Sequence, residues 1–443
     1  MTAEKRSEYR LSRYVKVIPY DGKQILLYNV STGKLYVAAE EKREQIEQFL
    51  KKNTVLDADI QNRMIGERLI VDINFDEVGL CELEFNKMVY SRETLDITII
   101  PTNDCNFKCV YCYEKHKKEY MSMDTAASII NYYKKNARFC KYLIVSWFGG
   151  EPLLNIDIME HIMRELLEIS KAHGVVVRTM VTTNGYLLSH EVFERLLKVG
   201  VRNYQITIDG LQETHNVQRP HVNNRDSFQR IIANLDTIMQ CNQKQRYEIS
   251  IRFNISKEMD RNKEKILDFF AEKYKNWKQL SFIFEWIRDW GGESLNRTIV
   301  TTPSICIEWI KTAKEKGMRC FDLFQNSCGM YFCEACKLNG FIIDFDGGIH
   351  KCTLAMEDEK YKQLNKIGVL RKNGEIQFNG NIIAWFKRNK RDKCTECVYY
   401  PICMGINCPL DTIIKQNTHC LPHKDLMEKY IDSLYMRGQY IVL

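Results

Sequence analysis

Six short apolar segments alternate with amphipathic stretches between about residue 95 and residue 284, and this alternation constrains the fold more than any other feature of the chain. Each segment is short enough to be a strand of a parallel sheet that helices cover on its faces. The six units predict an α/β fold with a partial (β/α)6 barrel. The predicted strands are Asp96–Ile100, Tyr142–Trp147, Val175–Val181, Asn203–Ile208, Glu248–Asn254 and Leu280–Phe284.

The N-terminal segment follows a different pattern. Three short apolar runs separated by turn residues come before two stretches with helical spacing and one more apolar run, and this order predicts a small winged-helix-like domain. The runs are Val15–Ile18, Gln24–Tyr28 and Lys34–Val37, the helical stretches are Glu40–Lys52 and Ile60–Glu67, and the last run is Leu69–Ile73.

The C-terminal segment is rich in cysteines and turns after about Phe321. Asp346-Gly347-Gly348 and Asn373-Gly374 are signals for β-hairpins. This segment therefore predicts a third domain. We expect domain ranges of 1–92, 93–315 and 316–443.

The composition is that of an ordinary globular protein, except for its cysteines. Hydrophobic residues make up 45% and charged residues 27%, close to the globular average. No apolar stretch predicts a membrane span or a signal peptide, so we expect a cytoplasmic protein. The net charge of +7 is too small to indicate a nucleic-acid partner. Seventeen cysteines form no stable disulfides in the cytosol and indicate metal binding.

Cys105, Cys109 and Cys112 follow directly after the first predicted strand of the barrel. A four-iron cluster normally takes four cysteine ligands, so three thiolates from one loop leave one iron open for another ligand. The spacing CxxxCxxC resembles the signature of the radical S-adenosylmethionine (SAM) superfamily. In that family the open iron binds the amino and carboxyl groups of SAM, and by resemblance Tyr111 lies near the adenine.

Other motifs at the ends of predicted strands resemble the same family. The resemblance implies that Gly149, Gly150 and Glu151 of the sequence GGEP hold the amino group of SAM. It also places Thr182-Thr183-Asn184-Gly185 and Asp209-Gly210 on the rim of the barrel where such sites are built. The resemblance therefore implies that SAM is also bound by residues of these motifs, with Thr182, Asn184 and Asp209 as the candidates. Arg219 is a candidate for binding the carboxylate of SAM.

The resemblance also implies the chemistry. A reduced cluster passes one electron to SAM, and the resulting 5′-deoxyadenosyl radical abstracts a hydrogen atom from the substrate. The cofactor performs this step, whereas the protein supplies position and excludes water. A flavodoxin- or ferredoxin-type protein is the implied electron donor.

The C-terminal cysteines resemble the SPASM domain, which holds auxiliary [4Fe-4S] clusters. By resemblance, one cluster takes Cys333, Cys352 and Cys408, with Cys328 or Cys336 as a fourth ligand or with an open iron. The second cluster takes Cys394, Cys397, Cys403 and Cys420. Together with the first loop this gives three [4Fe-4S] clusters. Because CxxC pairs also bind zinc, a pair of zinc sites is the alternative.

The N-terminal domain has two interpretations. A winged helix can bind DNA through a recognition helix, or it can hold an extended peptide along the edge of a strand. The predicted helix Glu40–Lys52 carries mixed charges, which favours a peptide. Maturases of ribosomal peptides often carry such a domain, which binds the leader of a precursor peptide.

The resemblance predicts a radical SAM peptide maturase that installs a thioether or carbon–carbon crosslink in a precursor peptide. The segment Lys351–Ala355 and the Cys403-x4-Cys408-Pro409 ending are most similar to such enzymes. One alternative is an anaerobic sulfatase maturase that forms formylglycine, with Asp322 as a candidate catalytic base. The other is a DNA-binding iron–sulfur sensor, which leaves the GGEP motif unexplained.

Overall fold

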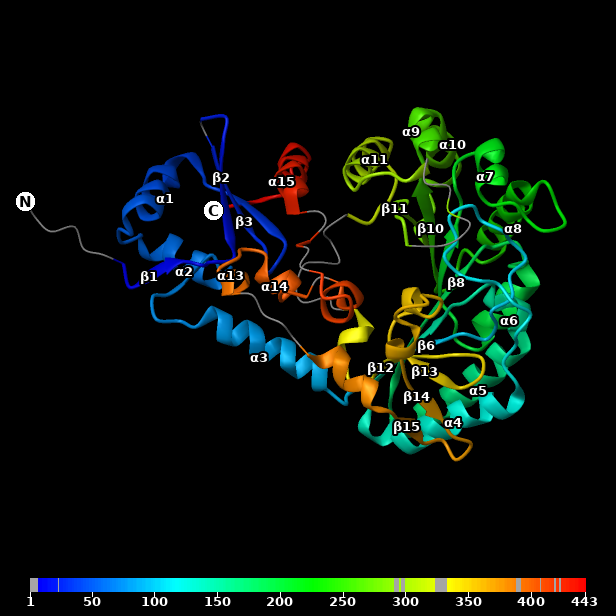
Figure 1. Cartoon of the computed structure of the whole chain (residues 1–443). Coiled ribbons are helices and arrows are strands. Elements are labelled where there is room, and N and C mark those ends of the chain that lie inside the picture. The colour runs from blue at the N-terminus through cyan, green and yellow to red at the C-terminus, as the bar shows by residue number, and fades with distance from the viewer. Residues whose placement is uncertain are drawn as a thin grey trace, which may run out of the picture.

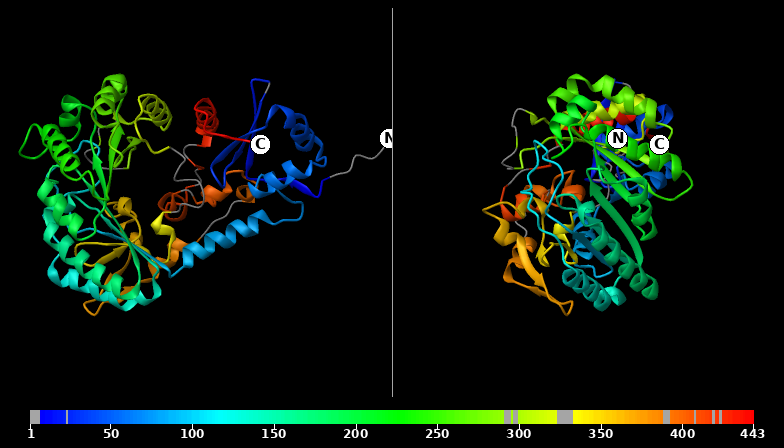
Figure 2. Two further views of the ribbon diagram at one scale, coloured as in Figure 1. Left: turned by 180° about the vertical axis from the view of Figure 1, so that it is seen from behind. Right: turned by 90° about the vertical axis from the view of Figure 1, so that its right-hand side faces the viewer.

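The computed structural model has two lobes that a long helix connects. In Figure 1 the N-terminal elements and the barrel lie at opposite ends, and α3 (Glu77–Tyr90) runs from one to the other. The segments that follow the barrel in sequence lie partly against the barrel and partly against the N-terminal lobe (Figure 2). The structure describes residues 7–22, 24–290, 295, 299–322, 333–387, 392–406, 408–417, 420–421 and 424–443.

The N-terminal lobe has the predicted order of strands and helices. Strands β2 to β4 form an antiparallel sheet, and β1 pairs antiparallel with β5. The elements are β1 (Tyr9–Leu11), β2 (Val15–Tyr20), β3 (Gln24–Asn29), β4 (Lys34–Val37), α1 (Glu40–Lys52), α2 (Ala58–Gly66) and β5 (Ile70–Asp72). Strand β1 and helix α3 are not among the predicted elements.

Local capping explains where the first helices of this lobe end and begin. Asn53 adopts a left-handed conformation at the end of α1, which Asn tolerates better than most residues. The Asp57 side chain accepts a hydrogen bond from the Ile60 backbone N at 2.9 Å and starts α2. Ile46 and Phe49 of α1 then pack in the core of the lobe.

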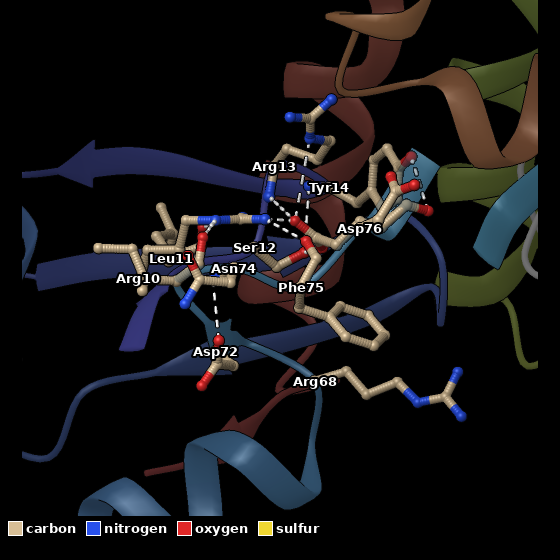
Figure 3. Close-up of polar contacts among 12 residues, drawn as sticks. Arg10, Leu11, Ser12, Arg13, Tyr14, Arg68, Asp72, Asn74, Phe75 and Asp76 are labelled. Atoms are coloured by element: carbon tan, nitrogen blue, oxygen red, sulfur yellow. Dashed lines mark hydrogen bonds and ion pairs between the residues drawn. The ribbon is translucent and has the colours of Figure 1, made fainter. Parts of the chain in front are cut away.

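A buried carboxylate ties β1 to the start of α3. Glu77 accepts hydrogen bonds from Arg10 Nη1 at 2.6 Å, from the Arg13 backbone N at 3.1 Å and from the Ser12 hydroxyl (Figure 3). Asp76 caps the same helix by accepting from the Gly79 backbone N at 2.9 Å. Because a buried carboxylate needs such partners, this cluster fixes the direction in which α3 leaves the lobe.

The barrel contains six parallel strands in sequence order. Strands that are consecutive in sequence from β6 to β11 are also hydrogen-bonded neighbours in the sheet. All six predicted strands are confirmed, with ends that differ by up to two residues. The strands are β6 (Thr94–Ile99), β7 (Tyr142–Trp147), β8 (Val176–Thr183), β9 (Asn203–Thr207), β10 (Glu248–Ile255) and β11 (Leu280–Trp286).

Helices between the strands cover the outer face of this sheet, as Figure 1 shows. Apolar side chains from strands and helices form one continuous buried cluster, which fixes the sheet and leaves the strand ends for a site. The helices are α4 (Met123–Asn136), η1 (Ala137–Phe139), η2 (Pro152–Asn155), α5 (Ile156–His173), α6 (His190–Lys198), α7 (Gln212–Gln218), α8 (Ser227–Cys241), α9 (Lys257–Arg261), α10 (Lys263–Tyr274) and α11 (Ser304–Glu315).

The first C-terminal strands extend the barrel sheet. Strand β12 (Gly340–Ile343) pairs parallel with β6, and β13 (Gly348–His350), β14 (Lys366–Leu370) and β15 (Ile376–Phe378) follow antiparallel. Both predicted hairpins are confirmed, and Gly347 and Gly374 have the positive φ values that such turns require. The cysteine-rich segment therefore begins as part of the same sheet that carries the barrel.

The remaining C-terminal elements are mostly single turns. Helix α15 (Met427–Met436) packs its Tyr430 and Ile431 against the N-terminal sheet, and β16 (Ile441–Val442) pairs parallel with β4. The short elements are η5 (Glu334–Cys336), η6 (Thr353–Ala355), α12 (Lys362–Asn365), η7 (Gly380–Phe386), α13 (Asp392–Thr395), α14 (Tyr400–Cys403), η8 (Leu410–Ile414) and η9 (Lys424–Leu426). Within the described ranges, no helix combines the length and the apolar character of a membrane span.

Candidate functional site

The loop after β6 carries the three clustered cysteines and is held by backbone hydrogen bonds. Lys108 N donates to Pro220 O at 2.9 Å, and Val110 N donates to Gln218 O at 3.0 Å. Both acceptors follow or end α7, so the loop is attached to the segment after β9. Cys105, Cys109 and Cys112 thereby lie in the wall of one pocket.

Two glycines let the strand-end motif after β7 approach this loop. Gly149 has φ of +110°, and a Cβ there would lie 2.6 Å from Thr102 O. A Cβ on Gly150 would lie 2.2 Å from Asp104 O. Any larger residue would collide with the backbone that leads into Cys105. The GGEP sequence is therefore explained by the close packing of two backbone segments.

Glu151 lies beneath this contact and is completely buried. Its carboxylate accepts hydrogen bonds from Thr183 Oγ1 at 2.7 Å, from the Asn184 backbone N at 2.8 Å and from Leu153 N at 3.1 Å. Burial raises the pKa of Glu151, and these hydrogen bonds oppose the rise. The side chain links the ends of β7 and β8, and it is not among the residues that line the pocket.

A polar network closes the floor of the pocket around Tyr111. The Tyr111 hydroxyl donates to Asp209, and it accepts from Arg219 Nη1 at 2.6 Å and from Asn254 Nδ2 at 3.0 Å. Arg219 Nη1 also lies 4.0 Å from Asp209 Oδ2. Arg219 Nε is buried without a hydrogen-bond partner in the described part of the chain, so it is an unused donor beside the pocket.

The pocket has a volume of about 430 Å³ and lies at the ends of the barrel strands. It brings together most of the residues that the sequence predicts for the cofactor. Asp209 does not line the pocket, but it accepts a hydrogen bond from Tyr111, which does. The predicted residues in its wall are Cys105, Cys109, Tyr111, Cys112, Gly149, Gly150, Thr182, Asn184 and Arg219.

The three thiols fit an iron–sulfur cluster by their chemistry. Burial raises the pKa of Cys105 and Cys109, and it raises the pKa of Cys112 to about 12. Thiols in such surroundings stay protonated unless a cation stabilises the thiolate. A bound iron cluster supplies that cation, because a coordinating thiol loses its proton.

Sequence reasoning missed two groups that lie beside Cys112. Ligand atoms of Cys112, Glu114 and His116 lie within 4.8 Å of one another, and His116 Nε2 is 3.5 Å from Cys112 Sγ. Burial raises the pKa of Glu114 to about 7 and lowers that of His116. The signal available in the sequence was their spacing, because Glu114 and His116 lie two and four residues after Cys112.

Four described cysteines of the C-terminal segment interact with one another. The thiol of Cys333 is affected electrostatically by Cys336 and Cys352, and Cys352 is affected by Cys408. Burial raises the pKa of Cys333 and Cys408, and it raises that of Cys352 to about 12. The set that the resemblance implies, Cys333, Cys352 and Cys408, thus contains thiols that are close enough to affect one another, and Cys336 affects Cys333 as well. Cys328 lies outside the described residues.

Lys351 is a buried cation next to these thiols. The side chain is fully buried, and its Nζ donates to Lys337 O at 2.5 Å and to Gly340 O at 2.7 Å. Burial lowers the pKa of Lys351 to about 8, whereas Cys336 and Cys333 act to raise it. Within the described residues it forms no ion pair. Because a buried unpaired ammonium is unfavourable, its position fits an anionic cluster held by the neighbouring thiolates.

The second predicted ligand set is arranged in short turns. Cys397 N donates to Cys394 O at 3.1 Å, and Ile406 N donates to Cys403 O at 2.8 Å. A Cβ on Gly405 would lie 3.4 Å from Cys394 Sγ, so the turn after Cys403 passes close to Cys394. Cys420 is exposed.

Asp322, the candidate base, contacts two cations. Its Oδ1 lies 2.6 Å from Lys314 Nζ and 3.7 Å from an Arg437 guanidinium nitrogen. Asp322 is not among the residues that line the pocket.

The fold and the pocket define a class of α/β enzymes that bind a cofactor at the ends of parallel strands, with three cysteines on the first strand-end loop. Residues 99–270 match the family model described as the Radical SAM superfamily. The chain therefore has a Radical SAM domain, and this family binds SAM and a [4Fe-4S] cluster. The match contains Cys105, Glu151 and Arg219.

Comparisons with individual proteins extend beyond this domain. The cysteine-type anaerobic sulfatase-maturating enzyme of Clostridium novyi is 25% identical over 385 residues, which cover 77% of this chain and 96% of the relative. A solved structure of native anSMEcpe with bound AdoMet and Cp18Cys peptide has a TM-score of 0.56 at 16% identity and covers 77% of this chain and 98% of that chain.

A second solved structure is similar over more of the chain. Streptococcus suis SuiB bound to S-adenosylmethionine has a TM-score of 0.50 at 14% identity, and it covers 92% of this chain and 97% of that chain. Likeness at these identities shows the fold alone. The chain thus shares its fold with anSMEcpe and with SuiB over these parts of its length.

Proposed function

We propose that the chain is a radical SAM peptide maturase that crosslinks a ribosomally made precursor peptide through a thioether or a carbon–carbon bond. The pocket carries this proposal, because the three cysteines, the GGEP backbone and the Tyr111–Arg219 network line or support one cavity. Peptide substrates are supported by anSMEcpe, which has been solved with a peptide. The segment Lys351–Ala355 supports crosslink formation, because it is similar to the corresponding segment of crosslink-forming peptide maturases.

The residues of the pocket have separate tasks in this proposal. When bound, the cluster and SAM supply one-electron chemistry that can remove a hydrogen atom from an unactivated carbon. Cys105, Cys109 and Cys112 hold the cluster. Arg219, whose Nε has no hydrogen-bond partner among the described residues, would bind an anionic group of the cofactor, since a carboxylate satisfies a guanidinium best. Glu151 keeps the ends of β7 and β8 in register.

The proposal includes two auxiliary [4Fe-4S] clusters. Cys333, Cys352 and Cys408, with Cys336 or Cys328, would hold the first, and the buried ammonium of Lys351 supports an anionic group there. Cys394, Cys397, Cys403 and Cys420 would hold the second. These clusters would be ligated apart from the cluster of the barrel loop.

The N-terminal lobe is proposed to bind the leader of the precursor. Its helix α1 pairs its own charges, with Arg43 and Lys51 both on Glu47, and this does not form a basic surface for DNA. Strand addition needs a free edge. Since β16 pairs with β4, the described strands of this lobe that lie at the edge of a sheet are β2, the two-residue β16, and β1 and β5 of the ribbon.

An apolar pocket beside the β1–β5 ribbon supports this role. It has a volume of about 310 Å³, and its wall includes Tyr9, Tyr14 and the half-exposed Phe75. Figure 3 shows the Arg68 side chain extending away from Arg10 and Ser12. A peptide that adds to the ribbon can therefore insert an apolar side chain between the ribbon and α3.

The direct test uses reconstituted protein, SAM, a reductant and a candidate precursor under anaerobic conditions. We expect 5′-deoxyadenosine together with a peptide that has lost two hydrogens and whose fragment ions show a crosslink. A full set of clusters should give about twelve irons per chain, from three clusters of four irons. A preparation with four irons plus zinc would contradict the auxiliary clusters.

Removal of the N-terminal lobe tests leader binding. A chain that starts at Glu93 should still cleave SAM slowly, yet lose most of the modification of a full precursor at low concentration, because tethering raises the effective concentration of the core peptide. High precursor concentration should partly restore turnover. Equal rates for the truncated and intact chains at low substrate would show that this lobe does not bind the leader.

Formylglycine formation is the second candidate. The sulfatase-maturating relative, aligned over 96% of its own length, favours it. The products differ in composition, since oxidation of a cysteine to formylglycine replaces sulfur by oxygen and also removes two hydrogens, whereas a crosslink only removes hydrogens. Mass spectrometry of a sulfatase peptide and a precursor peptide treated in parallel separates the two activities.

A further inference from the structure

The pocket that the cysteine loop lines also contains an arginine with few partners among the described residues. Arg288 follows β11, and its guanidinium carbon lies 3.6 Å from the ring centroid of Trp286 and 5.1 Å from that of Trp290. Its ion pair with Glu285 is 3.7 Å long, beyond a normal hydrogen bond. Among the described residues its guanidinium donates no hydrogen bond, although it has five N–H donors.

A second arginine lines the same pocket. Arg252 of β10 donates through Nε to Asn254 Oδ1 at 3.0 Å. Burial lowers the pKa of Arg288 most, the Glu285 carboxylate raises it, the positive charge of Arg252 lowers it further, and the thiols of Cys306 and Cys408 raise it. Arg252, Arg288 and Glu285 thus form a group of two cations and one carboxylate. Among these three side chains the positive charges outnumber the negative charge, which favours an anion beside them.

This group lies on other strands of the barrel than the cysteine loop, so we expect it to contact the substrate. The cysteine loop follows β6, whereas Arg288 follows β11, the strand farthest from β6 in the order of the six barrel strands. A cofactor held by the cysteine loop would therefore start beside β6. Trp286 covers one face of the Arg288 guanidinium, so the N–H groups at its edge stay available for a planar acceptor.

We propose that Arg288, assisted by Arg252, binds a carboxylate of the peptide substrate and so positions the peptide in the pocket. This inference rests on the proposed function, because it takes the substrate to be a peptide. A carboxylate matches the geometry, since it accepts two parallel N–H bonds from one guanidinium. The carboxylate comes from an Asp or Glu side chain or from the C-terminus of the peptide.

Binding of small probes to reconstituted, SAM-loaded full-length protein tests the proposal without reductant. The probes are acetyl-Gly-Glu-Gly-amide, acetyl-Gly-Gln-Gly-amide and acetyl-Gly-Gln-Gly with a free C-terminus, and calorimetry measures their affinities. We expect at least one acid probe to bind about tenfold more tightly than the neutral amide. The Glu probe and the free-acid probe distinguish the two sources. Equal affinities of all three probes for the wild type overturn the proposal.

Three variants place the effect on this side chain. Arg288→Gln should remove the preference for the acid probe, and Arg288→Lys should keep part of it, because Lys retains the charge but not the fork. Arg178→Gln is the matched control, since Arg178 lies over the Tyr142 ring outside the pocket. A preference that survives in Arg288→Gln overturns the proposal. Equal losses of SAM binding and probe binding in that variant do so as well.

The two proposals fail in different ways. Wild-type protein that modifies a precursor but shows no acid preference retains the peptide-maturase function and loses the subsite. Wild-type protein that prefers the acid probe through Arg288 but never cleaves SAM under reduction retains the subsite and loses the function.

Discussion

The barrel loop and the C-terminal cysteine segment are two predicted cluster sites that are built in opposite ways. Cys105, Cys109 and Cys112 lie on a loop whose backbone is hydrogen-bonded to Pro220 and Gln218. The backbone that leads into this loop packs against Gly149 and Gly150. The C-terminal cysteines lie in or beside elements of three to five residues, such as η5 and α14. The first site is positioned by a sheet, whereas the second is positioned by turns.

This difference decides what each site needs in order to form. A sheet with one continuous apolar core keeps its strand ends in place without help from a ligand. Isolated turns bury little apolar surface, so metal binding has to supply part of their folding energy. We therefore expect the barrel pocket to exist before the cluster binds and the C-terminal ligand sets to form together with their clusters.

The largest effect should come from removing the ligands of the barrel loop. The triple variant Cys105→Ala, Cys109→Ala and Cys112→Ala should produce no detectable 5′-deoxyadenosine, because no thiolate remains to hold the cluster that reduces SAM. Iron content should fall by about a third, since one cluster of three is lost. Chromatography of the product and iron analysis measure both quantities.

Cys241→Ala serves as the control for this variant, since Cys241 is an exposed free thiol on α8. It should keep full iron and full activity. SAM cleavage by the triple variant would show that the cluster site lies elsewhere.

Removal of iron should have a smaller effect, which differs between the barrel and the C-terminal cysteine segment. In chelated protein, hydrogen exchange should become much faster at the backbone amides of Cys352, Cys397 and Cys403, because their turns lose the metal that holds them. The amides of Val145 and Ile206 in the central strands should stay protected. Mass spectrometry with and without chelator measures the contrast. Equal loss of protection in both regions would contradict the idea of a preformed barrel site.

The sequence predicts the sheet-based region much better than the rest, for physical reasons. Six buried strands leave continuous apolar runs, and motifs at strand ends converge at one edge, so the pocket followed from local patterns. The spacing of Cys105, Cys109 and Cys112 depends on neighbouring residues only. These features are local in sequence, and the comparison with the Radical SAM family model confirms the class.

The unpredicted features depend on contacts between distant residues. Pairing of β12 with β6 and of β16 with β4 joins segments hundreds of residues apart and has no local signal. Arg288 and Lys351 each occur as one charged residue in the sequence, and only the fold shows that one is stacked on Trp286 and the other is buried beside thiols. The roles of such residues depend on which groups surround them in the fold. The spacing of residues in the sequence does not show this.

The smallest predicted effect concerns Lys351 and the auxiliary cluster beside it. Lys351→Met removes one buried positive charge next to Cys333 and Cys336 while keeping an unbranched side chain of similar length. Reduction adds a negative charge to a cluster, so losing the cation disfavours the reduced form. The reduction potential of that cluster should fall by roughly 50 to 100 mV, from about 2 kcal/mol of charge interaction at an effective dielectric constant of about 20.

Redox titration followed by electron paramagnetic resonance measures this potential in preparations with full iron content. Lys351→Arg keeps the charge and should leave the potential near that of the wild type. Lys372→Met is the matched control, because Lys372 is an exposed lysine that pairs with Asp124 on the surface. An unchanged potential in Lys351→Met, with all clusters present, would show that Lys351 does not interact with an auxiliary cluster. The two cysteine regions would then differ in how they fold but not in how their charges are balanced.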